Sequence, residues 1–553
     1  MEMQAWTKAM EYIGDLTWFG LVFEVKRKNL IQTEGVVGEA VAVAIAKKNE
    51  GVALTWLDQR RTIAWQQLLR LLKFSTPLEQ LPQEPLILQL SHLAGDMLDS
   101  DDASSIGELS ELDKQKRHCI AEDLDKCLKE ARMRPEFKGF KITPGKDELL
   151  RICQQMNSRI IIINMAKHTC DALCIQQGRI TNVVSLGKIY EIIQTASRDQ
   201  LDILEKAGLR DGPRRPHKAA PKPKQYNMVH VLQILWQNVV HPVLQVLGCN
   251  VKVSVVRCSQ ILRSHFILLQ IKLPLDQREH ITWCATGPLA SVPLDWAGPY
   301  DGQSPNLRDL AISSFIPFIS ALQQRVSTSA STSNQPKPSS TEILVFTEEH
   351  TLGHSALPGT KVELNHLKKI FTGSPHVKLI EGDSLHKESI EKVIQAIGMY
   401  TNVHLACHGS QKPNPLKSAF HLTPGNLTMD MLMRGKFEGK KLAFCSACQT
   451  AQGDEEVPDE HLYLAASMKI AGFDHVIGTR WSIKDDDAPA ITNRFYRGIF
   501  RNDMLDYSQV AHALHVATWE HFEYLTQEKK LSIDDAVICL AAYIHVGSRP
   551  MHI

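Results

Sequence analysis

The C-terminal part of the sequence alternates short apolar runs with amphipathic stretches, and this alternation constrains the fold more than any other feature. Apolar runs of a few residues predict strands at 342–346, 377–380, 402–407, 441–445, 475–479 and 542–546. Helical periodicity predicts helices at 361–371, 387–397, 459–471, 486–500 and 508–525. Short apolar strands separated by amphipathic helices are typical of a mostly parallel sheet with helices on both faces. The predicted fold class is therefore α/β.

The length of 553 residues requires more than one folded unit, because single cores stop growing at about 250–300 residues. The segment 327–340 is polar, contains two prolines and predicts a linker or loop before the unit 341–553. Short buried strands expected at 159–165, 170–175 and 182–186 predict a second α/β unit over 145–326. Residues 1–90 have helical spacing, and the charged stretch 91–144 is predicted to be a helical connector.

The overall composition excludes several classes of protein. Lys and Arg number 62 against 61 Asp and Glu, so the net charge of +1 gives no support to nucleic-acid binding driven by bulk charge. No apolar run approaches the roughly 20 residues of a membrane-spanning helix, and no secretory signal is visible. Twelve cysteines without a signal peptide indicate reduced thiols, and a cytoplasmic location is expected.

Reactive side chains follow two of the predicted strands. The run 402–407 ends at His408 and Gly409, and the run 441–445 is followed by Cys448. In open parallel sheets, functional groups sit beyond the carboxyl ends of the strands. If these two strands are neighbours, His408 and Cys448 would face each other across the sheet edge.

A Cys–His pair at this place predicts thiol acyl transfer. A free thiol with a pKa of about 8.5 is a poor nucleophile at neutral pH, so it needs an imidazole or a dipole beside it. His408 could take the thiol proton and later protonate the leaving amine. The amides of Gly409 and Cys448 are the candidate oxyanion hole.

A metal or redox site is the alternative that the spacing leaves open. Cys445 and Cys448 form a CxxC, and His404 and His408 are spaced HxxxH, so the four could supply zinc ligands. A CxxC could also be a redox pair. Against zinc, strand alternation would send Cys445 and Cys448 to opposite faces, and His404 lies in mid-strand.

Several segments resemble the CHAT family of caspase-like cysteine peptidases, with separase a more distant relative. The segments HLACHG at 404–409 and SACQTAQGDE at 446–455 carry the resemblance, followed by the long segment 465–489. Flanking segments also resemble fungal CHAT proteins: 283–300, 312–322, 357–360 and 543–547. The resemblance covers roughly residues 130–553. Residues 53–68 resemble the end of the TPR array that usually precedes this domain.

The resemblance implies a fold and a set of site residues. It implies a caspase-like catalytic unit with the dyad His408 and Cys448, preceded by a caspase-like unit that lacks the dyad. It further implies a carboxylate for a basic substrate side chain, for which Asp485 and Asp487 are the matching positions. A bidentate contact to arginine suits such acids, whereas acids before Ala488 would equally favour the start of a helix.

These observations predict a cysteine endopeptidase that cleaves a protein substrate, after a basic residue, without a metal or an organic cofactor. A protein activator that binds the helical N-terminus would gate it in a signalling or cell-death pathway. The alternative of another class is a regulatory scaffold whose dyad is idle.

Overall fold

The computed structural model describes most of the chain in sixteen stretches. They are residues 2–16, 18, 20–21, 23–33, 35–59, 85–106, 110–134, 144–209, 227–248, 274–322, 341–382, 388–412, 415–435, 437, 439–447 and 464–548. These residues form two compact units: one holds the described residues up to Arg151, and the other holds the described residues from Ile152 onward.

The N-terminal unit is helical, as predicted. Its helices are α1 (Glu2–Leu16), α2 (Phe23–Gln32), α3 (Val36–Ala46), α4 (Glu50–Gln59), α6 (Pro85–Ile106) and α7 (Glu111–Met133), and α8 (Lys146–Gln154) begins in it. Helices α3 and α4 pack against each other, and both helices bury alanines and other apolar residues. The hydroxyl of Ser110 accepts a hydrogen bond from the amide of Asp113 and so caps α7. The similarity of this unit to TPR repeats remains a prediction.

The second unit is built on one sheet. Among the described residues, eleven strands lie in the order β3-β2-β1-β4-β5-β16-β13-β12-β8-β6-β7. Their bounds are β1 (Arg159–Asn164), β2 (Cys170–Gln176), β3 (Arg179–Gly187), β4 (Glu279–Ala285), β5 (Ala311–Phe315), β6 (Thr341–Thr347), β7 (Val377–Glu381), β8 (Asn402–Ala406), β12 (Lys440–Ser446), β13 (Phe473–Thr479) and β16 (Tyr543–Gly547). Most neighbouring strands run parallel; β2 is antiparallel to both its neighbours, and β16 is antiparallel to β13. The predicted α/β class with a mostly parallel sheet is confirmed.

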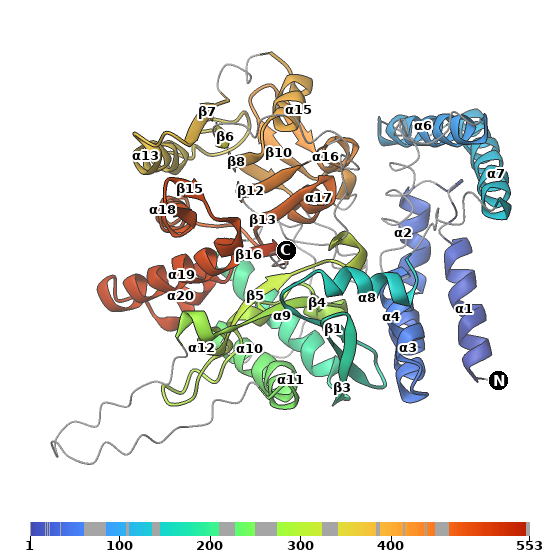
Figure 1. The fold of residues 1–553 in the computed structure, drawn as a ribbon, viewed down its shortest axis with the longest axis horizontal. Coiled ribbons are helices and arrows are strands. Elements are labelled where there is room, and N and C mark those ends of the chain that lie inside the picture. The colour runs from blue at the N-terminus through green and yellow to red at the C-terminus, as the bar shows by residue number, and fades with distance from the viewer. Residues whose placement is uncertain are drawn as a thin grey trace. The chain divides into compact units, whose positions relative to one another are not determined.

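Helices cover this sheet. They are α9 (Tyr190–Lys206), α10 (Met228–Leu235), α11 (His241–Val246), α12 (Leu307–Leu310), α13 (Gly359–Phe371), α15 (Ile390–Met399), α16 (Met429–Arg434), α17 (Leu464–Ala471), α18 (Ala488–Ile499), α19 (Val510–Glu523) and α20 (Ile533–Leu540). Figure 1 shows α13 and α18 to one side of the strands β6–β13 and α15, α16 and α17 to the other. The central strands β8 and β12 are buried along almost their whole length because both of their faces are covered.

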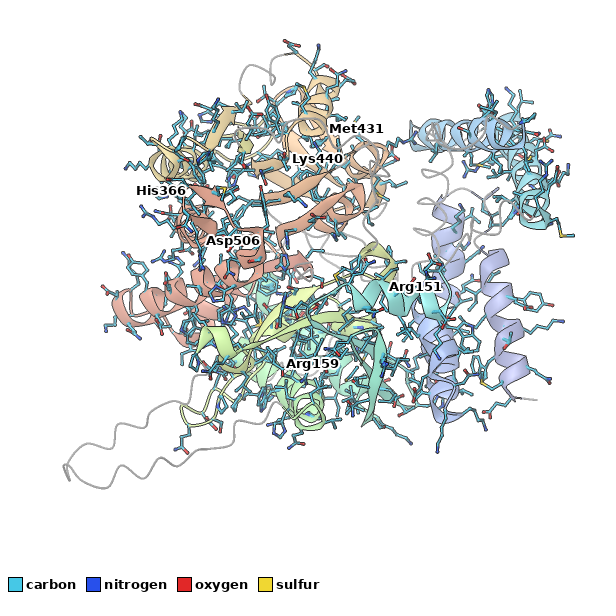
Figure 2. All side chains as sticks on the ribbon, viewed as in Figure 1. Arg151, Arg159, His366, Met431, Lys440 and Asp506 are labelled. Atoms are coloured by element: carbon cyan, nitrogen blue, oxygen red, sulfur yellow. The ribbon has the colours of Figure 1, made fainter. Side chains whose placement is uncertain are left out.

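A lysine closes the turn that leads into β8. Lys440 is 3% exposed, and its Nζ donates to the carbonyls of Gly398 and Tyr400 at the end of α15, at 2.6 and 2.8 Å (Figure 2). Burial lowers the pKa of Lys440 to about 8. A cation at the C-terminal end of a helix is favourable because the last carbonyls have no partner within the helix.

The alternation predicted after residue 341 is confirmed, with several differences. Strand β16 is antiparallel to β13, residues 408–428 hold three short strands where no strand was predicted, and α20 was not predicted either. In the first half, α9 was likewise not predicted. The predicted linker 327–340 lies outside the described residues. The predicted domain bounds remain a prediction, and the strands of 145–326 and 341–553 share one sheet.

A series of hydrogen-bonded side chains joins the two halves of the sheet. The ladder between β5 and β16 has one matched pair, Val546 with Phe315. Across it, His545 Nδ1 lies 2.6 Å from Ser314 Oγ, which in turn lies 2.6 Å from His280 Nε2. On the other side, His545 Nε2 lies 3.0 Å from His475 Nδ1.

An ion pair also crosses between the halves. Arg480, directly after β13, donates to Asp295 Oδ1 at 2.8 Å and to the carbonyl of Ala541 at 2.8 Å. Its guanidinium lies over the ring of Phe315, 4.6 Å from the centroid. Arg480 is 5% and Asp295 7% exposed, so the pair is buried and both charges depend on each other.

We predict that acid weakens this fold through His475. Burial, together with the charges on Lys469 and Lys441, lowers its pKa to about 4 against the opposing effect of Asp474. The unfolded chain binds a proton near pH 6.5, whereas the folded chain excludes that proton until about pH 4. Stability is therefore full above pH 6.5 and falls as the pH drops towards 4.

Thermal unfolding of the wild type and of His475→Gln, measured from neutral to acidic pH, tests this. The variant should lose less stability than the wild type as the pH falls, since glutamine does not titrate. Exposed His376 supplies the control, His376→Gln, which should follow the wild-type curve. Parallel curves for His475→Gln and the wild type would contradict the prediction.

Candidate functional site

The two strands that carry the predicted dyad are neighbours. β8 and β12 run parallel, with Asn402 opposite Leu442 and Ala406 opposite Ser446. Their carboxyl ends therefore meet at one edge of the sheet, as the prediction of the site required. Cys448 itself lies outside the described residues; the described chain reaches Ala447, which is 1% exposed.

The end of β12 is held from two neighbouring strands. The amide of Cys407, after β8, donates to the carbonyl of Ser446 at 3.3 Å. The hydroxyl of Thr479, the last residue of β13, donates to the carbonyl of Ala447 at 2.6 Å. These contacts fix the main chain that leads into Cys448.

His408 and Gly409 lie in a small sheet beside the edge. After β8 the chain forms β9 (His408–Ser410), β10 (Ala419–Leu422) and β11 (Gly425–Thr428), in the order β11-β10-β9. The pairing places His408 opposite His421 and Gly409 opposite Phe420. His408 is thus the first residue of β9. It lies outside the main sheet, in a short strand that pairs with β10.

A backbone carbonyl fixes the orientation of His408. Nε2 of His408 lies 2.8 Å from the carbonyl oxygen of Ser355, in the loop between β6 and α13. A carbonyl only accepts hydrogen bonds, so Nε2 must carry the proton and Nδ1 is the nitrogen left to act as base. The same carbonyl would stabilise the imidazolium that forms when Nδ1 takes up a proton.

Two further histidines pack around His408. The ring of His354 stacks on His408 with centroids 4.6 Å apart, and it lies 4.6 Å from the ring of His421. His421 contacts Ser410 Oγ through Nε2 at 2.8 Å and Asn426 Oδ1 through Nδ1 at 2.7 Å. Burial lowers the pKa of His421, and the charge on His408 lowers it further, so His421 favours its neutral form.

Asp485, one of the two acids predicted to bind substrate, lies near His408. Its Oδ2 accepts a hydrogen bond of 2.7 Å from the amide of Gly359, the first residue of α13. Burial raises the pKa of Asp485, as do the charges of Glu363 and Asp486, whereas Gly359 and His408 lower it. The carboxylate therefore feels the imidazole of the predicted dyad while it caps a helix.

Asp487, the other predicted acid, contacts a different element. Its Oδ1 lies 2.9 Å from Nε2 of His521 in α19, and both side chains are largely buried. It also immediately precedes α18, but its side chain makes no capping hydrogen bond there. The structure thus places Asp485 within electrostatic reach of His408 and Asp487 against His521.

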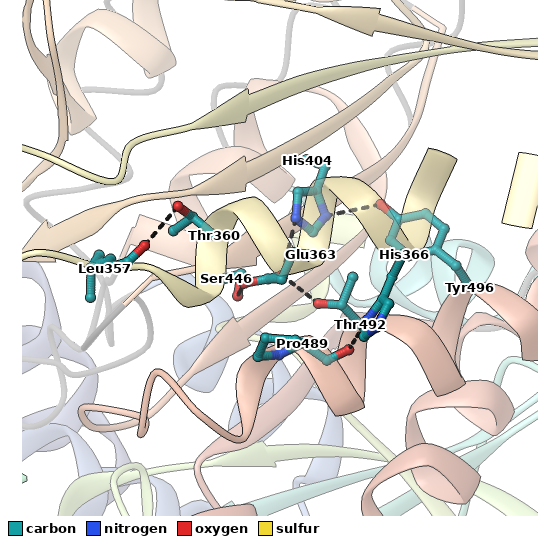
Figure 3. Close-up of polar contacts among 9 residues, drawn as sticks. All are labelled: Leu357, Thr360, Glu363, His366, His404, Ser446, Pro489, Thr492 and Tyr496. Carbon is teal, nitrogen blue, oxygen red and sulfur yellow. Dashed lines mark hydrogen bonds and ion pairs between the residues drawn. The ribbon is translucent and has the colours of Figure 1, made fainter. Parts of the chain in front are cut away.

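His404, a candidate zinc ligand from its spacing, belongs to a buried cluster (Figure 3). Its Nε2 lies 3.2 Å from Oε2 of Glu363, at a charge-contact distance without the alignment of a hydrogen bond, and its Nδ1 lies 3.3 Å from the hydroxyl of Tyr496. The ring stacks on Phe444, so Cys445, the next residue, points to the opposite face of the sheet. Within the described stretches, no group of three or more His, Cys, Asp or Glu residues could hold a metal ion.

The sequence model of the CHAT domain family matches residues 230–524, more than half of the chain. The chain belongs to the CHAT domain family. With its mostly parallel sheet and flanking helices, the chain has the α/β architecture that the resemblance implied.

Solved structures with detectable similarity to this CHAT chain include two of a separase–securin complex from Saccharomyces cerevisiae. One has 10% identity and a TM-score of 0.42 and covers 99% of this chain and 40% of that chain. The other has 10% identity and a TM-score of 0.41 and covers 94% and 37%. The complex of Porphyromonas gingivalis RgpB pro- and mature domains has 8% identity and a TM-score of 0.34 and covers 50% and 65%.

The chain spans about 40% of the separase chain it matches. The comparison with curated proteins finds no match. Of the helices that the structure describes, none combines the length and apolar character needed to cross a bilayer.

Several residues around the CHAT site were not singled out from the sequence. The contact of Ser355 is made by its backbone, which leaves no signal in the residue type. Glu363, in contrast, could have been noticed in the sequence. It lies four residues before Leu367 and eight before Phe371, so all three fall on the buried face of α13. A charged residue on an apolar stripe is a sequence-level sign of a buried polar contact.

The CHAT site predicts one tautomer for His408. Long-range nitrogen–proton correlation spectra of protein labelled at histidine nitrogen should show the neutral ring protonated on Nε2, because Ser355 offers only an acceptor. The spectrum of His408→Gln would assign the signals. A neutral ring protonated on Nδ1 would contradict the orientation described.

Proposed function

We propose that this CHAT chain is a cysteine endopeptidase with Cys448 as nucleophile and His408 as general base and acid. One observation carries the proposal. His408 follows the end of β8 with its Nε2 held by the carbonyl of Ser355, and β8 pairs with β12, the strand that leads to Cys448. The arrangement leaves Nδ1 of His408 as the free base, and the sequence supplies a thiol at the adjoining strand end.

The reaction would proceed through a thioester. Nδ1 of His408 takes the thiol proton, and the sulfur of Cys448 bonds to the carbonyl carbon of the substrate. The tetrahedral intermediate collapses as the C–N bond breaks, and the imidazolium gives its proton to the leaving amine. Water, deprotonated by Nδ1, then attacks the thioester, and the proton returns to the thiolate as the acid product leaves.

Two amides are proposed to stabilise the negative oxygen of the intermediate. They are the N–H groups of Cys448 and Gly409, which follow the ends of neighbouring strands. Donors fixed before reaction stabilise developing charge at no cost of reorganisation, and losing one such donor typically costs about 100- to 1,000-fold in kcat. The missing side chain of Gly409 also keeps the approach to Cys448 clear.

We propose a preference for cleavage after a basic residue, with Asp485 as the main acid and Asp487 as the second. The proximity of Asp485 to His408 supports its assignment, since a side chain bound there would lie beside the reacting carbonyl. Asp487 keeps a structural alternative in its contact with His521. Gating by a protein partner at residues 1–90 belongs to the same proposal.

The dyad is tested by covalent labelling and by cleavage. A peptide with a thiol-directed warhead should form an adduct at Cys448 in the wild type, and His408→Ala should slow its formation by about 100-fold or more. Cys448→Ala should abolish both the adduct and peptide cleavage. A wild type that forms no adduct in the presence of its activator would contradict the proposal, and full biological effect of Cys448→Ala would favour the scaffold alternative.

The substrate preference is tested at Asp485. Asp485→Asn should lower kcat/KM about tenfold or more for peptides with arginine or lysine before the scissile bond, because a charged hydrogen bond is lost. Peptides with a neutral residue there should be affected less. The matched control is Asp503→Asn, at an exposed position outside the candidate site, which should leave both values unchanged. Equal losses for basic and neutral peptides would assign Asp485 to capping α13 alone.

A further inference from the structure

The carboxylate of Glu363 is buried next to the strands that lead to the candidate site. Glu363 in α13 is 2% exposed. Ser446 Oγ donates to its Oε1 at 2.8 Å, and Thr492 Oγ1 donates to its Oε2 at 2.5 Å. His404 Nε2 lies 3.2 Å from the same Oε2. Figure 3 shows Glu363 between these three partners, which come from β12, α18 and β8.

Two of these partners belong to the strands of the proposed dyad. His404 lies in β8 on the way to His408, and Ser446 is the last residue of β12 before Ala447 and Cys448. The carboxylate therefore joins the two strands by their side chains at the place where Cys407 and Ser446 join them by their backbones. A shift of one strand end against the other would break a contact to Glu363.

We propose that Glu363 is a positioning residue that sets the separation of His408 and Cys448. The inference rests on the proposed function, because it assigns a role in that reaction. Misplacement of reacting groups by about 1 Å can cost 100-fold in rate, so a clamp on the two strand ends acts directly on the reaction.

The free-energy cost of burying the carboxylate of Glu363 supports a positioning role for this residue over a role in core packing alone. An apolar residue of similar volume would avoid the desolvation of a carboxylate, and replacing buried ion pairs in this way is often neutral or stabilising. The two hydrogen bonds from Ser446 and Thr492, together with the close approach of His404, in contrast favour one geometry. The charge of Glu363 also raises the pKa of Asp485, so its field reaches the site.

The experiment compares Glu363→Gln with the wild type in the full chain. The first readout is the pH dependence of alkylation of Cys448 by iodoacetamide, followed on the Cys448 peptide by mass spectrometry. In the wild type the alkylation midpoint should lie well below about 8.5, the value of an ordinary thiol; in the variant it should rise towards it. The second readout is peptide cleavage, where kcat should fall about 10- to 100-fold with KM unchanged.

The matched control is His366→Gln. His366 lies in the same helix and contacts the carbonyl of Pro489 through Nδ1 at 3.1 Å, so it joins α13 to α18 without touching β8 or β12 (Figure 3). This control should leave the alkylation midpoint and kcat unchanged. If Glu363→Gln lowers the unfolding temperature but leaves the alkylation midpoint in place, Glu363 is structural and the inference is overturned.

Two outcomes separate this inference from the proposed function. A wild type whose Cys448 alkylates with the profile of an ordinary thiol would overturn the proposed dyad whatever the variant does. If Glu363→Gln does not fold, Ser446→Ala decides, because it removes only the contact from β12. A raised midpoint in Ser446→Ala supports the positioning role, and an unchanged midpoint overturns it.

Discussion

The parallel pairing of β8 with β12 is the contact on which the candidate site depends, because it decides where both strands end. Both strands are buried and covered on both faces, and a slip of one residue would turn every side chain to the other face. His404 would leave its buried partner Glu363, and His408 would no longer follow the sheet edge. The register of two buried strands thus determines the position of the polar groups beyond them.

Polar contacts set the geometry where the backbone ladder is short. The two halves of the sheet meet at β5 and β16 over one matched pair, Val546 with Phe315. Apolar packing alone would tolerate small slides at such a seam, since it has no direction. The hydrogen bond between His545 and Ser314 and the buried contact of Arg480 with Asp295 tolerate no such slide, because their distances are short and both partners are buried. The half without the dyad therefore helps to hold Arg480, which directly follows β13.

The elements easiest to predict from the sequence were those long enough to repeat the hydrophobic periodicity of a strand or a helix. Most of the longer strands and helices after residue 341 were predicted because each spans several residues of one periodicity, although α20 was missed. The edge that carries His408 followed from their alternation. The small strands β9, β10 and β11 were not, because three or four residues cannot reveal an alternation. The antiparallel direction of β16 was not predicted either, since its apolar pattern is the same in both directions. Of the site contacts, those made by side chains such as Glu363 left a trace in the sequence, while the carbonyl of Ser355 left none.

Helix α13 connects the two proposed parts of the site. Its first residue, Gly359, donates to Asp485, and a side chain at 359 would collide with the backbone of Asp485, so only glycine allows this approach. One turn later, Glu363 receives the hydroxyl of Ser446 at the end of β12. A cation bound at Asp485 would share that carboxylate with the start of α13, because the same group already caps the helix. Any displacement of the helix on binding would pass to Glu363 and hence to β12, so the proposed substrate-binding acid and the strand that leads to Cys448 are linked through one helix.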